Sequence, residues 1–429
     1  MSMLRRSAVG TVLAADSMPA ASSVSIGIWI PYGSRCEKPQ QRGFFHFIEH
    51  MLFKGTNGHN ARELARIFER TGGFVNAFCE RSMTCVHCTV PVNVWQESCD
   101  TLLEMAFLSS FPENEFQKEK AVIVSEILQT DDDPEELAHE HFFQRFWPEQ
   151  TIGLPIAGKV DEVQAIARDE LFSFYIRVFN PERALISIAG SFDENEAIER
   201  IERMLERVYT LIASSRHTAS ALSIERARPQ NFALYEKKPL ALSYAIQGTQ
   251  APVPRDSRDY LISTIINEMW GGSTISRLFQ RLREDRGLCY TVYSSYETEA
   301  DESLWIVHLQ SAKKFLPTAL DMLDEETNGL ARTPFSQSEF EDAHERVRGL
   351  IALSMDDSDY RQRRMARQFF AHHRLESVDE ELAWMSSIGY DETVDVSMKM
   401  LASSSARFVF GAIPEREMKK RGYLESEGF

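Results

Sequence analysis

The sequence has few cysteines, no long apolar run and fewer basic than acidic residues. Six cysteines in 429 residues do not indicate a framework of disulfides, so a reducing compartment is expected. No run of about 18 or more apolar residues occurs, which argues against a transmembrane helix. Lys and Arg number 47 against 64 Asp and Glu, and the net charge of −17 argues against a surface that binds nucleic acid or anionic lipid. We therefore expect neither a nucleic-acid partner nor a membrane partner.

Two parts of the chain repeat one pattern, which predicts two homologous domains. Residues 111–116 correspond to residues 335–340, at an offset of 224. Residues 214–230 are rich in Ser, Ala and Arg and lack periodicity, as is typical of a linker. We predict an N-terminal domain over residues 1–213, a linker over residues 214–230 and a C-terminal domain over residues 231–429. Two domains of about 200 residues also suit a chain too long for one compact core.

Strand and helix patterns follow one another in the same order in both halves. Residues 24–30 alternate as in a strand, and residues 44–53 are apolar on nearly all sides, as in a buried helix. Residues 240–247 and 259–270 repeat that order. Strands grouped with flanking helices predict an α+β fold. Each of its two domains is expected to be a mainly antiparallel sheet covered by helices on one face.

A histidine–glutamate motif lies within the first predicted helix. His46 and His50 are four residues apart, so both imidazoles project from one helix face and can bind one zinc ion. Glu49 lies beside them, where it can act as a base without being a ligand. This H-x-x-E-H spacing is that of the inverted zincins. Two imidazoles and a carboxylate on a buried helix need partners, because unpaired polar groups are unfavourable there.

A third ligand is expected on another helix, since catalytic zinc usually takes three protein ligands and leaves one position open. Glu119 and Glu126 lie seven residues apart and share a helix face with the apolar residues Phe116, Ile123 and Ile127. Periodicity alone allows either glutamate to be the ligand. It also allows a structural histidine pair and two solvated glutamates.

Five segments of the chain together resemble the pitrilysin/insulinase-type zinc metallopeptidases, and in particular their processing-peptidase branch. They are residues 43–56, 72–78, 119–126, 153–158 and 276–290. The resemblance covers essentially the whole chain. It implies a zinc-dependent endopeptidase that hydrolyses unfolded peptides or presequence-like segments inside a closed chamber. The alternatives are a non-catalytic scaffold subunit and a peptide-binding module of the same fold.

The resemblance also implies roles for individual residues. It makes Glu126 the third ligand of one zinc ion per chain, and Glu119 a second acid that supports the site. It implies that Arg283 and Tyr290 of the C-terminal domain hold the substrate. The peptide backbone is implied to pair with an edge strand that contains Asn76, Ala77 and Phe78.

The second half lacks the metal residues, since no imidazole occurs near residues 265–270. One domain is therefore expected to carry zinc and the other to carry substrate contacts. Because this chain has both sets of residues, the resemblance implies a homodimer with two sites. Residues 1–8 contain two arginines but no apolar signal segment, so we expect a bacterial-type cytoplasmic protein rather than one of the mitochondrial matrix.

Overall fold

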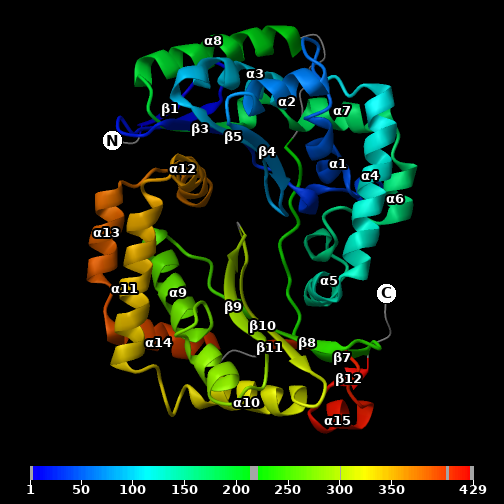
Figure 1. Ribbon diagram of the computed structural model, residues 1–429, viewed down its shortest axis with the longest axis vertical. Coiled ribbons are helices and arrows are strands. Elements are labelled where there is room, and N and C mark those ends of the chain that lie inside the picture. The colour runs from blue at the N-terminus through cyan, green and yellow to red at the C-terminus, as the bar shows by residue number, and fades with distance from the viewer. Residues whose placement is uncertain (1–2, 213–220, 300, 402–404, 426–429) are drawn as a thin grey trace. The chain divides into compact units, whose positions relative to one another are not determined.

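The computed structural model describes residues 3–212, 221–299, 301–401 and 405–425 (Figure 1). Part of the expected linker, residues 214–220, lies outside the described residues. The chain forms two compact units, and neither is continuous in sequence. Unit 1 contains Met1–Gln129, Pro155–Glu225 and Ala352–Ser377. Unit 2 contains Thr130–Leu154, Arg226–Ile351 and Val378–Phe429.

Unit 1 is built on a sheet whose described strands number six, in the order β1-β2-β6-β3-β5-β4. Their bounds are β1 (Met3–Arg6), β2 (Val12–Ser17), β3 (Ser23–Ile30), β4 (Phe74–Cys79), β5 (Thr84–Pro91) and β6 (Leu185–Gly190). Neighbouring strands are antiparallel except for β2 and β6, which are parallel. Within the described sheet β4 pairs only with β5, so β4 forms an edge.

Helices from the first half cover one face of this sheet. Val24, Ile26 and Ile28 of β3 point into an apolar cluster that includes residues of the overlying helices. The helices of the first half in unit 1 are α1 (Phe44–Met51), α2 (Ala61–Glu69), α3 (Trp95–Phe107), α4 (Glu113–Asp132), α6 (Val160–Ala165), α7 (Arg168–Val178) and α8 (Glu194–Ile212). Because β3 alternates, the same strand turns Ser25 and Trp29 to the opposite face.

Unit 2 repeats the arrangement, with the described strands in the order β12-β7-β11-β8-β10-β9. Their bounds are β7 (Ala233–Lys237), β8 (Leu242–Ala251), β9 (Thr291–Thr298), β10 (Ser303–Ala312), β11 (Ser405–Gly411) and β12 (Leu424–Glu425). Here β7 runs parallel to both of its neighbours, and the other pairs are antiparallel. The accompanying helices are α9 (Ser257–Trp270), α10 (Leu316–Gly329), α11 (Gln337–Ser354), α13 (Val378–Ser387), α14 (Tyr390–Leu401) and α15 (Glu415–Lys420). The predicted α+β fold with two homologous, mainly antiparallel sheets is confirmed.

The two halves exchange one helix each, which the sequence did not indicate. Helix α5 (Pro134–Phe146) comes from the first half and packs on β8 and β11 of unit 2. Helix α12 (Ser358–His372) comes from the second half and packs on β2, β3 and β6 of unit 1. The two helices begin 224 residues apart, as do α4 and α11, so the repeat offset is confirmed. The exchanged helices add a second helical layer to the single one expected.

Glycines let the exchanged helices approach the sheets closely. A Cβ atom on Gly27 of β3 would lie 2.2 Å from Oε1 of Gln362 on α12. A Cβ atom on Gly248 of β8 would lie 2.4 Å from Cζ of Phe142 on α5. A side chain at either position would collide with the side chain that the exchanged helix places there. The predicted division into residues 1–213 and 231–429 follows the sequence repeat and stays a prediction. It does not take account of the exchange of α5 and α12 between the two units.

No described helix is both long and apolar enough to cross a membrane.

Candidate metal centre

Helix α1 carries the histidine motif, and its N-terminus is held by two features. Gly43 precedes the helix with φ of 79°, and a Cβ atom there would lie 2.6 Å from the carbonyl oxygen of Ala157. The buried Glu37 carboxylate accepts hydrogen bonds from the backbone N–H groups of Gly43 at 2.9 Å and Phe45 at 2.8 Å. Burial raises the pKa of Glu37 to about 8, and the two backbone hydrogen bonds oppose the rise. Both features fix where α1 begins.

An aromatic contact sets the position of α4 beside α1. The rings of Phe47 on α1 and Phe116 on α4 stack with centroids 4.7 Å apart and planes 3° apart, and both side chains are buried. Glu119 follows Phe116 by three residues, and Glu126 follows Glu119 by seven, so the two glutamates project from one side of α4. The packing therefore brings both carboxylates to the histidines of α1.

The donor atoms of the three predicted ligands, His46, His50 and Glu126, lie close together. Oε2 of Glu126 lies 3.9 Å from Nε2 of His46 and 3.4 Å from Nε2 of His50. One donor atom from each of the three residues lies within 4.8 Å of the others, and the described residues contain no second group of this kind. Donors about 2.1 Å from a tetrahedral zinc ion are about 3.4 Å apart. Two imidazoles and one carboxylate at these separations therefore fit a zinc ion with small adjustments.

The structure separates the two glutamates that periodicity left equivalent. Glu126 faces the Nε2 atoms, and its side chain is 50% exposed. Glu119 is buried on the other edge of the His50 ring, where its Oε2 lies 3.1 Å from Nδ1. Its second oxygen, Oε1, lies 2.8 Å from Nζ of Lys54. Glu119 is thus placed behind a candidate ligand and not among the donor atoms.

Glu49 and His46 lie in a partly desolvated environment. Burial raises the pKa of the Glu49 carboxyl and Glu126 adds to the rise, while His50 and a backbone hydrogen bond from Cys79 oppose it. Burial lowers the pKa of His46 and the neighbouring His50 lowers it too, so that together they bring it to about 4. A neutral imidazole is the form that binds a metal ion, and a carboxylate of raised pKa suits proton transfer near neutral pH.

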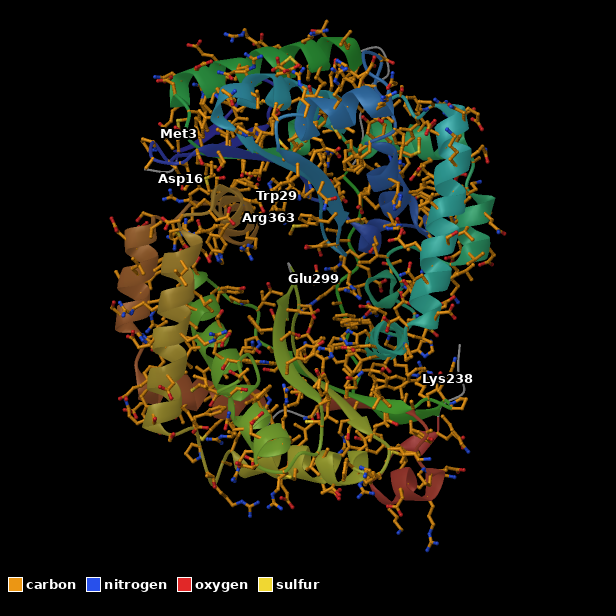
Figure 2. All side chains as sticks on the ribbon, in the orientation of Figure 1. Met3, Asp16, Trp29, Lys238, Glu299 and Arg363 are labelled. Carbon is orange, nitrogen blue, oxygen red and sulfur yellow. The ribbon has the colours of Figure 1, made fainter. Side chains whose placement is uncertain are left out.

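The predicted substrate strand lies at the edge of the unit 1 sheet. Asn76 is exposed, Phe78 is half-buried, and Ala77 between them points into the core. An edge strand offers unpaired backbone groups to a further strand. Helix α12 contributes Arg363, which is labelled in Figure 2. Its guanidinium lies 5.1 Å from the centre of the Phe78 ring. The exchanged helix therefore contacts the strand that was predicted to receive the peptide.

The predicted substrate residues of unit 2 lie close together within that unit. Arg283 is in a π-helical segment, Phe279–Glu284, and its guanidinium carbon is 5.4 Å from the Tyr290 ring. The Tyr290 side chain is 75% exposed, while its backbone N–H donates to the carbonyl of Gln310. π-Helical turns occur frequently at functional sites. Arg283 and Tyr290, which are seven residues apart in the sequence, are therefore adjacent in the structure, and the phenol of Tyr290 is accessible.

Two residues of the centre, Lys54 and Glu37, were not predicted from the sequence. Lys54 follows His50 by four residues and continues the spacing of His46 and His50, so the helical pattern contained a signal. Glu37 lies in the loop before α1, and no periodicity identifies it. Only the packed structure brings its carboxylate to the helix start.

Two consecutive parts of the sequence match domains of one protein family. Residues 12–160 match the family described as insulinase (peptidase family M16). Residues 165–347 match the domain described as peptidase M16 inactive domain. This second match covers most of the half that lacks the histidine motif.

Relatives and solved structures align along almost the whole chain. An uncharacterized zinc protease of Bacillus subtilis, YmxG, is 28% identical over 397 residues, which are 92% of this chain and 95% of that protein. The solved structure of a protease from Helicobacter pylori is similar with a TM-score of 0.85, at 16% identity over 96% of this chain and 99% of that one. A chain of complex III2 from Candida albicans has a TM-score of 0.78, at 15% identity over 97% and 99% of the two chains. At these identities the two structures establish a shared fold.

Proposed function

Because the chain belongs to the insulinase-type peptidases of family M16, we propose that it is a zinc-dependent endopeptidase. The observation that carries this proposal is the convergence of His46, His50 and Glu126 donor atoms beside the carboxylate of Glu49. The proposed ligand set holds one zinc ion per chain. When bound, zinc is a Lewis acid that polarises the peptide carbonyl and makes water a stronger nucleophile.

Glu49 is the proposed general base. Its carboxylate takes a proton from the attacking water and later donates it to the amine that leaves. The raised pKa of Glu49 supports this role, because a base that must also act as an acid works best with a pKa near the working pH. Glu119 supports the site through its contact with His50.

The proposed substrate is an unfolded peptide. Its backbone adds to the edge of β4 at Asn76, Ala77 and Phe78, so that much of its affinity does not depend on side chains. Arg283 and Tyr290 are proposed to orient the peptide and to stabilise the oxyanion that forms. The exposed phenol of Tyr290 and the adjacent guanidinium support this role.

We further propose that the protein acts as a homodimer that encloses its substrate, as in the processing-peptidase branch. The presence of both the zinc residues and the Arg283–Tyr290 pair in one chain supports two equivalent sites. Light scattering during size-exclusion chromatography tests this point, and a monomer at working concentration would contradict it.

The proposed activity is tested with a library of quenched fluorescent peptides and purified protein. Cleavage is expected to stop when a chelator removes the metal and to return when zinc is added. Cleavage that resists complete zinc removal contradicts the proposal. A protein that binds one zinc ion and peptides but cleaves none would support the scaffold or peptide-binding alternative.

The Glu49→Gln variant isolates the base from the metal. We expect it to fold, to bind zinc as the wild type does and to lose activity by about 10²–10⁴-fold, because only proton transfer is removed. Zinc content and initial rates are measured on the same sample. A zinc-loaded Glu49→Gln variant with the wild-type rate would show that another group is the base.

A further inference from the structure

Lys54 lies on the helix face that carries the candidate ligands. The helical turn continues past the end of α1, since the N–H of Phe53 lies 3.4 Å from the carbonyl oxygen of His50 and the N–H of Lys54 lies 3.1 Å from that of Met51. His46, His50 and Lys54 are therefore successive residues at a spacing of four. The ammonium group reaches the side of α4 on which Glu119 lies.

The contacts of Glu119 form a chain from Lys54 to His50. Its Oε1 lies 2.8 Å from Nζ of Lys54, and its Oε2 lies 3.1 Å from Nδ1 of His50. The Glu119 side chain is 8% exposed and that of Lys54 is 26% exposed, so water competes little for the first group. The lysine ammonium group can donate hydrogen bonds but cannot accept them. It therefore occupies Oε1 of Glu119, and Oε2 is left to accept a hydrogen bond from the imidazole of His50. Buried carboxylates require such partners.

This chain of contacts assigns the hydrogen on the His50 ring. Because Oε2 of Glu119 accepts, Nδ1 carries the hydrogen and Nε2 keeps its lone pair. Nε2 is the atom that lies 3.4 Å from Oε2 of Glu126. We infer that Lys54 is a positioning residue of the metal centre, which acts through Glu119 to hold the His50 ring with Nε2 directed at the Glu126 carboxylate.

The other histidine of the pair lacks this support. Nδ1 of His46 is buried and has no hydrogen-bond partner among the described residues. The orientation of the imidazole pair is therefore fixed through His50 to a greater extent than through His46. Partners behind a ligating histidine typically change metal affinity about 10–100-fold, which is the size of effect expected for Lys54.

The experiment measures zinc affinity by competition with a fluorescent chelator. Lys54→Met is expected to weaken zinc binding about tenfold or more. Lys54→Arg is expected to restore most of the affinity, because it keeps a donor with a positive charge. Lys118→Met is the matched control, since Lys118 is 64% exposed, pairs with Glu115 and lies next to Glu119 in the chain. We expect this control to bind zinc as the wild type does.

A double-mutant cycle tests whether Lys54 acts through Glu119. Glu119→Gln alone is expected to weaken zinc binding, and adding Lys54→Met to it is expected to cause little further loss, because residues in one network are not additive. Losses that simply add would overturn the inference, as would a Lys54→Met variant of unchanged affinity. Thermal unfolding of the zinc-free variants is measured alongside, because the loss of a partner of the buried Glu119 carboxylate lowers stability as well. Zinc affinities are therefore compared at a temperature at which every zinc-free variant is folded.

The inference rests on the metal site of the proposed function but not on cleavage. If the wild type binds zinc and cleaves no peptide, the proposed activity fails, and the affinities still decide the role of Lys54. If the wild type cleaves peptides but Lys54→Met binds zinc normally, only the inference fails. A wild type that binds no zinc overturns both.

Discussion

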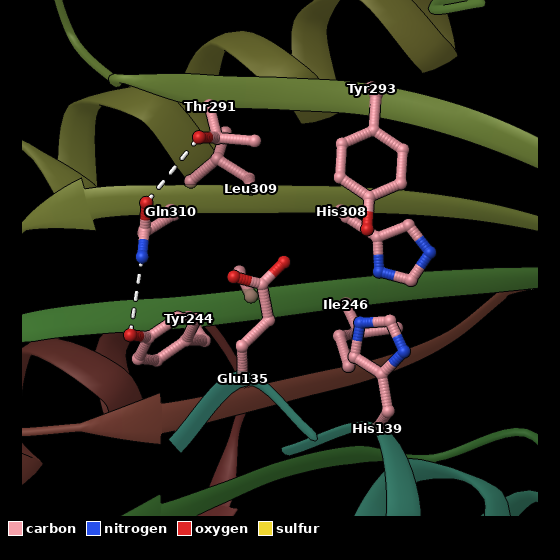
Figure 3. Close-up of a pocket in the computed structure, with 10 residues that line it drawn as sticks. Glu135, His139, Tyr244, Ile246, Thr291, Tyr293, His308, Leu309 and Gln310 are labelled. Atoms are coloured by element: carbon pink, nitrogen blue, oxygen red, sulfur yellow. Dashed lines mark hydrogen bonds between the residues drawn. The ribbon is translucent and has the colours of Figure 1, made fainter. Parts of the chain in front are cut away.

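Each unit of this protein contains a pair of adjacent histidines, and the two pairs differ in geometry. In unit 1 the rings of His46 and His50 lie edge to face, with centroids 4.8 Å apart and planes 69° apart. In unit 2 the rings of His139 and His308 are stacked, with centroids 4.2 Å apart and planes 17° apart. Figure 3 shows the second pair with Tyr293 beside it. Tyr293 also stacks with His308, with ring centroids 4.5 Å apart.

The difference shows why a pair of histidines does not by itself make a metal site. The lone pair of an imidazole nitrogen lies in the ring plane, so stacked rings do not direct two lone pairs at one point. The edge-to-face pair also has Glu126 as a third donor, whereas the stacked pair belongs to no group of three donors in the described part of unit 2. Ring geometry and a third ligand separate a candidate metal centre from aromatic packing.

The largest expected effect comes from removing one histidine from each pair. His50→Ala is expected to weaken zinc binding more than about 100-fold and to abolish cleavage, since a ligand is lost rather than a supporting partner. His308→Ala makes the same change in the stacked pair and is expected to leave the zinc content unchanged. Metal analysis after dialysis compares the two. A fall in zinc content in His308→Ala would break the comparison.

A smaller effect is expected from the part of unit 2 that we propose contacts substrate. Tyr290→Phe removes only a hydroxyl and is expected to lower kcat by about 100-fold while zinc content stays the same, because one donor to the oxyanion is lost. Tyr260→Phe is a matched control, since Tyr260 is also exposed and has no proposed role. The kcat of each variant is measured with one peptide under steady-state conditions. Equal kcat values for the two variants would show that Tyr290 has no part in the mechanism.

An effect comparable in free energy to that of Tyr290→Phe is expected on the pH dependence of stability. Burial lowers the pKa of His308 and the neighbouring His139 lowers it too, so that together they bring it from 6.5 to about 3. Between these values the unfolded chain binds a proton that the folded chain does not, so stability falls as the pH falls. His308→Phe keeps the stacking and removes this titration. Between pH 7 and pH 4.5 the free energy of unfolding falls in both proteins. In the His308→Phe variant this fall is expected to be about 2–3 kcal/mol smaller than in the wild type.

Urea unfolding at the two pH values checks this expectation. A chelator is present in every sample, so that zinc binding in unit 1 does not add its own pH dependence. Equal losses of stability in the wild type and the variant would show that the stacked pair does not titrate on unfolding as its burial indicates.

Much of the fold and of the centre could be predicted because it depends on local patterns. Periodicity placed the strands and helices close to their observed bounds, as with the helix expected at residues 259–270 and observed as α9 (Ser257–Trp270). The repeat at an offset of 224 predicted two equivalent halves. The spacing of His46 and His50 placed both rings on one face of α1, because residues four apart in a helix are neighbours.

The sequence by itself determined the repeated α+β pattern, the histidine pair and the two candidate glutamates, since helix and strand periods are properties of short segments. Periodicity left the two glutamates equivalent, and the family resemblance implied Glu126 as the ligand. Only the tertiary structure shows the contacts themselves, with Glu126 facing Nε2 of His50 and Glu119 lying between Lys54 and Nδ1 of His50. It also decided that α5 and α12 pack on the sheets of the opposite halves. These outcomes depend on contacts between distant segments, such as the stacking of Phe47 on Phe116, and side-chain packing of that kind has no period along the chain.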